Sequence, residues 1–149
     1  MRQAPRISYL IVTASLLFIV ALCLRAESPQ GDADKLPKVI VSGMNAYKAD
    51  GPNAAVRAWI KGSPIEGSKE VLSQANNLRQ IQDFYGAYKG FHLIQSKDLS
   101  SNTRVIYLTI DFELGPVFAK FLMYRAEQDW ILTSFLLNTN PDVILPSCK

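Results

Sequence analysis

The sequence predicts an α+β domain in which three N-terminal helices pack on a curved antiparallel sheet of about four strands. Residues 36–88 carry helical periodicity, whereas residues 91–139 alternate apolar and polar side chains or are apolar nearly throughout. The breaks between the last three strands, at Gly115-Pro116 and at residues 127–129, are short. Because parallel strands need a crossover of a dozen or more residues, these strands are expected to be antiparallel neighbours.

The first two helices are separated by Asp50-Gly51-Pro52. The first is expected over residues 36–50, and its apolar residues form one stripe of an amphipathic helix: Leu36, Ile40, Met44 and Tyr47. The second is expected over Pro52–Lys61, because proline is tolerated at the first helical position. The residues that share its apolar face are Ala55, Val56, Trp59 and Ile60.

A long third helix is expected to run to about Tyr88. Ser63 and Glu66 have the spacing of a capping box, but Gly67 interrupts it, so Ser68 is the second candidate for the N-cap. The helix should then bury one stripe: Val71, Ala75, Leu78, Ile81, Tyr85 and Tyr88.

Four strands are expected, over residues 91–97, 103–114, 116–126 and 130–139, with Asp98 ending the first. The second alternates cleanly, and its apolar side chains should face the core: Ile106, Leu108, Ile110, Phe112 and Leu114. The last two strands are apolar on both faces, which is typical of a sheet covered on both sides. The helices should cover one face, and a second subunit is expected on the other.

Residues 1–26 are expected to be a secretory signal peptide, since Arg2 and Arg6 precede an uncharged run from Ile7 to Leu24. The run exceeds the ~7–15 residues of an ordinary signal and approaches the ~20 that span a bilayer. An uncleaved N-terminal anchor is therefore the alternative, and it would be the chain's only membrane contact. Both place the domain outside the cytoplasm, in the periplasm or secreted.

Cleavage is expected after Ala26 or after Cys23, and lipidation of Cys23 is a further alternative. Residues 27–35 are predicted to be a linker and residues 36–149 a single domain. After cleavage no internal disulfide can form, because Cys148 is then the only thiol. Cys148 is interpreted as an unremarkable terminal thiol, with an intermolecular bridge as the alternative.

The net charge of +3 does not indicate a nucleic-acid partner. Three of the 16 basic residues lie in residues 1–26 without any acid, and the other 13 balance the 13 acidic residues. A neutral domain lacks the electrostatic footprint that binds a phosphate backbone. No nucleic-acid binding is therefore expected.

The order of the elements resembles the nuclear transport factor 2-like superfamily. The resemblance covers about residues 36–140 and rests on Ala46–Gly51, on Trp59 in the second helix, on Gly115-Pro116 and on Trp130 at the start of the last strand. It implies a cone-shaped, cystatin-like fold with a cavity between helices and sheet. It implies no single function, since this superfold hosts isomerases, hydrolases and many non-catalytic binding modules.

No catalytic residue, metal or cofactor is expected. His92 is the only histidine, which leaves a histidine-based triad or a zinc site without its usual residues. The ketosteroid-isomerase-like branch of the superfamily uses an aspartate base with tyrosine and protonated-aspartate donors, but no residue here aligns with that motif. The residues that supply suitable side chains for lining a cavity are Tyr47, Trp59, Tyr85, Tyr88, Tyr107, Asp111 and Tyr124.

The function predicted is an exported, non-catalytic binding or interaction module. Its cone would hold a small apolar ligand, or its sheet face would pair with a second copy in a homodimer or with another partner. The alternative is an isomerase- or dehydratase-type enzyme that uses a carboxylate and a tyrosine in the same cone. A cone plugged by Trp59, Leu78 and Phe84 would favour the module or a purely structural role, and a buried carboxylate facing a tyrosine hydroxyl would favour the enzyme.

Overall fold

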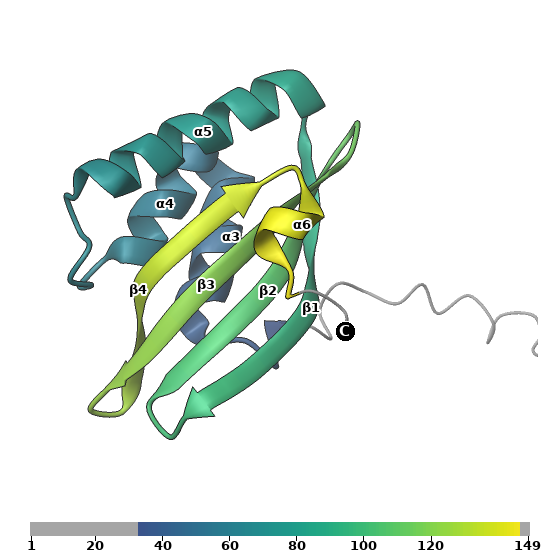
Figure 1. Cartoon of the computed structure of the whole chain (residues 1–149). Coiled ribbons are helices and arrows are strands. Elements are labelled where there is room, and N and C mark those ends of the chain that lie inside the picture. Colours follow the sequence, from purple (N-terminus) through teal and green to yellow (C-terminus); the bar gives the residue numbers. More distant parts are fainter. Residues whose placement is uncertain (1–32, 147–149) are drawn as a thin grey trace, which may run out of the picture.

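The structure, a computed structural model, describes residues 33–146 and confirms the predicted fold class (Figure 1). Helices α3 (Lys38–Asp50), α4 (Pro52–Ile60) and α5 (Lys69–Tyr85) lie on one face of a curved four-stranded sheet. The sheet is an antiparallel meander in the order β1-β2-β3-β4. The strands are β1 (Tyr88–Ser100), β2 (Thr103–Phe112), β3 (Pro116–Ala126) and β4 (Asp129–Asn138), followed by a short helix, α6 (Pro141–Ile144). The predicted leader, both cysteines and most of the predicted linker lie outside the described residues.

The turn between α3 and α4 follows the sequence signals closely. The Gly51 amide donates to the Tyr47 carbonyl at 2.9 Å, which ends α3. Gly51 has a φ of 82°, in the left-handed region that glycine occupies without steric cost. Pro52 then starts α4, where its missing N–H costs no helical hydrogen bond.

The structure decides between the two candidate N-caps of α5 and corrects the predicted end of this helix. Ser68 is the N-cap, and its hydroxyl accepts from the Val71 amide at 3.3 Å. The Ser63 capping box does not form, because the Glu66 carboxylate accepts from the Gly62 amide instead. At the other end, the predicted extension of the helix to Tyr88 is wrong.

Gly86 ends α5 after Tyr85. It has a φ of 84° and donates to the Gln82 carbonyl, as a C-terminal glycine does. Tyr88 is consequently the first residue of β1 and belongs to the sheet. Tyr88 was assigned to the helix only because its spacing from Tyr85 continues the apolar stripe of α5.

Two strand boundaries also differ from the prediction. The first strand continues through Asp98, whose carboxylate pairs with Arg104 on β2 at 2.6 Å. The second strand ends at Phe112, and Leu114 is 76% exposed, so its predicted place in the core is wrong. The Leu114 amide donates to the Tyr85 carbonyl at 2.9 Å, which turns this residue out of the ladder.

The inner face of the sheet holds the core, as the alternation predicted. The residues of β2 and β3 that are fully buried there are Ile106, Leu108, Ile110, Val117, Ala119, Phe121 and Met123. On the outer face, Ile144 of α6 and Leu145 pack on Val105, Tyr107 and Phe118. The chain's own C-terminal turn thus covers part of the face that the sequence assigned to a second subunit (Figure 1).

Both edges of the sheet have features that oppose further strand pairing. At β4, Gln74 accepts from the Leu137 amide and Asn77 donates to the Leu137 carbonyl, at 3.3 and 3.4 Å. These amide side chains of α5 satisfy the backbone as a neighbouring strand would. At β1, three register shifts interrupt the pairing with β2, and bulges of this kind protect an edge.

Between residues 33 and 146, no helix is long and apolar enough to cross a membrane.

Candidate functional site

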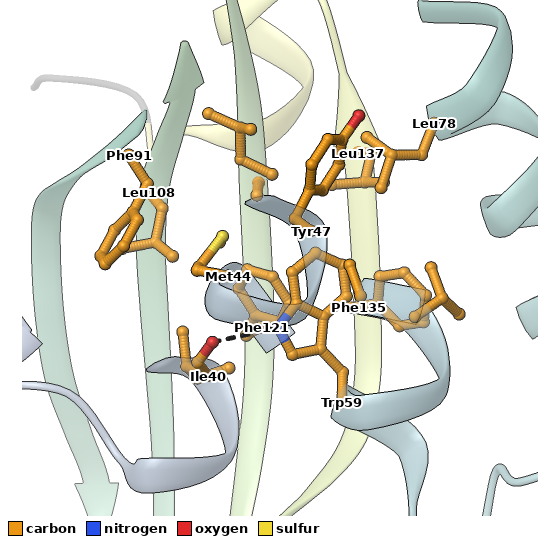
Figure 2. Packing of buried hydrophobic residues seen from close by; sticks show 14 of the residues in the cluster. Ile40, Met44, Tyr47, Trp59, Leu78, Phe91, Leu108, Phe121, Phe135 and Leu137 are labelled. Atoms are coloured by element: carbon orange, nitrogen blue, oxygen red, sulfur yellow. Dashed lines mark hydrogen bonds between the residues drawn. The ribbon is translucent and has the colours of Figure 1, made fainter. Parts of the chain in front are cut away.

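The interior of the cone is filled with side chains. The Trp59 ring is fully buried, with ring centroids 5.1 Å from Phe121 and 5.9 Å from Phe135 (Figure 2). Its indole nitrogen donates to the Ile40 carbonyl at 3.2 Å, which satisfies the polar group within the core. Leu78 is also fully buried, whereas Phe84 is 80% exposed. Two of the three residues named as a plug therefore fill the cone.

At one end of the cone, Tyr47 and Tyr88 stack with ring centroids 4.5 Å apart. The Phe112 ring lies edge-on to both, at 6.0 and 6.4 Å. The Tyr47 hydroxyl donates to Gln82 Oε1 at 2.8 Å. This cluster joins α3, α5 and the first two strands.

The environment of this cluster keeps both tyrosines neutral. Burial raises the pKa of Tyr47 well above its ordinary value, with smaller contributions from Tyr88 and Asp83. Burial also raises the pKa of Tyr88 to about 12, ahead of the contribution of Asp111. Both hydroxyls therefore stay protonated to a higher pH than an exposed tyrosine does.

Asp111 lies on the outer face of the sheet. Its neighbours Ile110 and Phe112 are buried against the helices, so alternation directs Asp111 away from them. Asp111 Oδ2 lies 3.1 Å from His92 Nε2, and this pair is partly exposed. Among the described residues no group of three histidine, cysteine, aspartate or glutamate side chains could hold a metal ion.

The remaining candidates lie in three separate places. Tyr85 is half-buried against Gly115, below the turn between β2 and β3. Tyr107 is buried on the outer face beneath Ile144, and Tyr124 is 45% exposed. Of the seven predicted residues, the structure thus brings only Tyr47 and Tyr88 into ring contact and leaves Trp59 in the core.

A hollow lies between α3 and the first residues of β1. This α3–β1 groove has a volume of about 490 Å³. From α3 it is lined by Val41, Met44, Asn45 and Lys48, and from β1 by residues 88–91. Ala33 and Asp34 line its end near the start of α3. Among the seven predicted residues, Tyr88 alone lines it.

The α3 residues of the groove were missed in the sequence, although a signal exists. Val41, Asn45 and Lys48 recur at i, i+4 and i+7, which places them on one helical stripe beside the buried one. A stripe of mixed polarity at the border of a core is usually a solvated helix face. Only the position of β1 beside it makes it the wall of a groove.

A second hollow, of about 410 Å³, lies between the residues before α3 and the sheet end at Arg104 and Trp130. The guanidinium groups of Arg104 and Arg125 lie over the Trp130 ring, 4.8 and 4.6 Å from its centroid. Because Asp98 also binds Arg104 through two hydrogen bonds, this guanidinium is already engaged within the fold. The arrangement stabilises the hairpins and leaves little of Arg104 for a ligand.

Comparison with solved structures finds chains of similar fold. No protein-family model matches the chain, and no curated protein matches it. A crystal structure of a domain of unknown function with a cystatin-like fold, from Nostoc punctiforme, is similar at a TM-score of 0.49 and 11% identity. The match covers 74% of this chain and 78% of that one. The description of the present fold as a cystatin-like α+β arrangement rests on its own element order and sheet topology.

Proposed function

We propose that this chain is an exported, non-catalytic module of the nuclear transport factor 2-like type that binds a small apolar ligand in the α3–β1 groove. The observation that carries the proposal is the packed interior: Trp59 and Phe121 occupy the space where such a cone would hold a ligand. Open volume lies instead at the side of the cone. The groove's volume of about 490 Å³ falls within the ~300–1,000 Å³ of small-molecule sites.

The lining of the groove supports an apolar ligand. Met44 and Phe91 are almost fully buried and form an apolar floor, while Asn45 and Lys48 are exposed at the rim. Methionine and aromatic side chains adapt well to irregular apolar ligands. Tyr88 is fixed by its stacking on Tyr47, so this wall is held by the core rather than by a loop.

No observation among the described residues favours the enzyme alternative. An isomerase or dehydratase of the expected type needs a carboxylate and a tyrosine hydroxyl that face the same cavity. Asp111 lies beside His92 on the other face of the sheet from the helices. The binding module is therefore the function we propose.

A saturable titration tests the groove as the site. Decanol, added below the concentration at which it separates, should shift the amide resonances of Asn45, Lys48 and Gly90 in two-dimensional NMR of the purified chain. Asn45→Trp, which places an indole at the exposed rim, should abolish these shifts. Ser42→Trp is the matched control, because Ser42 is exposed on the same helix and does not line the groove.

The opposite result would be shifts that spread over the core around Trp59, or no saturable binding of an apolar probe. The first would place the ligand in the cone, and the second would remove the binding function. Residues 7–24 are rich in apolar residues, so only binding that Asn45→Trp abolishes counts in favour of the groove.

Export and a homodimer are further parts of the proposal. Export is supported by the composition of residues 1–26, and the intact mass of the protein recovered from its host tests it. Recovery in the cytosol with Met1 present would contradict it. For the homodimer, Tyr124 of β3 and Leu136 of β4 are exposed. Sedimentation should show a dimer that Leu136→Glu converts to a monomer.

A further inference from the structure

Resting on the proposed function, we infer that the ligand of the α3–β1 groove is an amphiphile with one anionic head, a carboxylate or a phosphate, next to Lys48. Its apolar body would lie along α3 over Met44 and Phe91. The inference follows from the distribution of charge along the groove and from the length of its apolar wall.

The charges differ between the two ends. Lys48 lies in the last turn of α3, and Lys89 lines the same groove from β1. Asp34 lies at the opposite end, since it also lines the hollow at the start of α3. A ligand in the groove therefore meets cations at one end and a carboxylate at the other. An anionic head is favoured beside Lys48 and disfavoured beside Asp34.

The two lysines are not equivalent. Lys89 Nζ lies 3.0 Å from Glu113 Oε1, so its charge is already compensated within the fold. Lys48 is exposed, and no described carboxylate lies within ion-pair distance of its ammonium group. Lys48 is thus the cation available to a ligand. Lys89 adds to the positive potential at this end of the groove. Its ion pair with Glu113 leaves its ammonium group less available to an anionic ligand.

The size of the apolar body follows from helix geometry. Val41 and Lys48 are seven residues apart, which corresponds to about 10 Å along a helix that rises 1.5 Å per residue. Between them the wall is formed by Met44 and by Tyr88 on the facing strand. An alkyl chain of medium length fits this distance.

Four probes with the same ten-carbon chain test the head group: decanoate, decyl phosphate, decanol and decyltrimethylammonium, each below its micelle concentration. Binding to the purified chain is measured by calorimetry and by the amide shifts of the groove. The two anions should bind at least about threefold more tightly than decanol, as expected for one partly solvated ion pair. The cation should bind more weakly than decanol. Raising the salt concentration should reduce this difference.

Lys48→Gln should weaken decanoate binding by about threefold to fivefold more than it weakens decanol binding. Lys61→Gln is the control, since this exposed lysine lies outside the groove. If decanoate prefers the groove and decyl phosphate does not, the head is a carboxylate, and the reverse result assigns a phosphate. Equal binding of decanol and both anions, unaffected by Lys48→Gln, would overturn the inference and leave the apolar groove intact. Failure of every probe to bind would overturn the proposed function itself.

Discussion

Gly43 of α3 lies directly against the indole ring of Trp59 on α4. A Cβ atom at residue 43 would overlap indole Nε1 and Cδ1, and one turn earlier the Ile40 carbonyl accepts the indole hydrogen bond. The two helices therefore approach so closely that only a glycine fits at the crossing. This contact closes the interior of the cone and leaves the open volume at its side.

We predict that Gly43→Ala destabilises the protein by about 1–2 kcal/mol, measured as the free energy of unfolding in urea. Alanine favours a helix over glycine by about 1 kcal/mol, but overpacking a rigid ring costs about 1–3 kcal/mol and requires the helices to separate. Ser42→Ala, on the exposed side of α3, should change stability by less than about 0.5 kcal/mol. A stabilised Gly43→Ala variant would show that the two helices can move apart without loss.

Phe112→Ala should destabilise by about 3–5 kcal/mol, because it empties a core position that contacts the rings of Tyr47 and Tyr88. Leu114→Ala, at the next apolar position of the sequence pattern, should cost less than about 1 kcal/mol since Leu114 is exposed. The free energy of unfolding, measured at equilibrium for both variants, checks these two predictions. Similar losses for the two would mean that β2 buries a different set of residues.

Stability should fall as the pH rises from about 10 to about 12. The pKa of Tyr47 and that of Tyr88 are raised by folding, so the unfolded chain releases these protons at a lower pH than the folded protein does. In that window the folded state binds more protons, and the unfolding free energy decreases with pH. Urea unfolding measured on both sides of pH 10 tests this. Tyr88→Phe should make the decline shallower, whereas Tyr124→Phe, at an exposed residue, should not.

Replacement of Gln74 and Asn77 by alanine should open the edge of β4. The amide and carbonyl of Leu137 would lose their α5 partners, and hydrogen exchange at the Leu137 amide should accelerate. Hydrogen exchange is a better measurement than the free energy of unfolding for this variant. The higher helix propensity of alanine offsets part of the stability lost with the two hydrogen bonds, each worth about 1 kcal/mol. Gln80→Ala, exposed on α5, is the control. Unchanged exchange at Leu137 would show that water serves as well as these side chains.

The prediction of individual elements succeeded where local chemistry acts alone. Ser68 follows the rule for an N-cap, and Gly51-Pro52 separates two helices as expected. It failed where one periodicity was extended past a turn. Tyr88 continued a helical stripe and Leu114 continued a strand stripe, yet Gly86 and the backbone hydrogen bond from Leu114 to Tyr85 place both residues elsewhere.

The candidate site was less predictable than the fold. Tyrosines and aspartates were chosen by residue type, and type does not reveal which face of a strand a neighbouring element covers. Tyr107 was compatible with a cavity until α6 proved to lie over it. Val41, Asn45 and Lys48 carry ordinary side chains and become a groove only through their distance from β1.

Four features follow from the amino-acid sequence alone: the class of the domain, the order of helices before strands, the antiparallel connections and the buried face of β2. Each of them depends on the periodicity of apolar residues or on short-range turn chemistry. Only the tertiary arrangement shows that the cone is filled, that α6 covers part of the outer face and that open volume lies beside α3. These properties depend on which side chains pack together although they lie far apart in the sequence. No local sequence pattern specifies which of them come into contact.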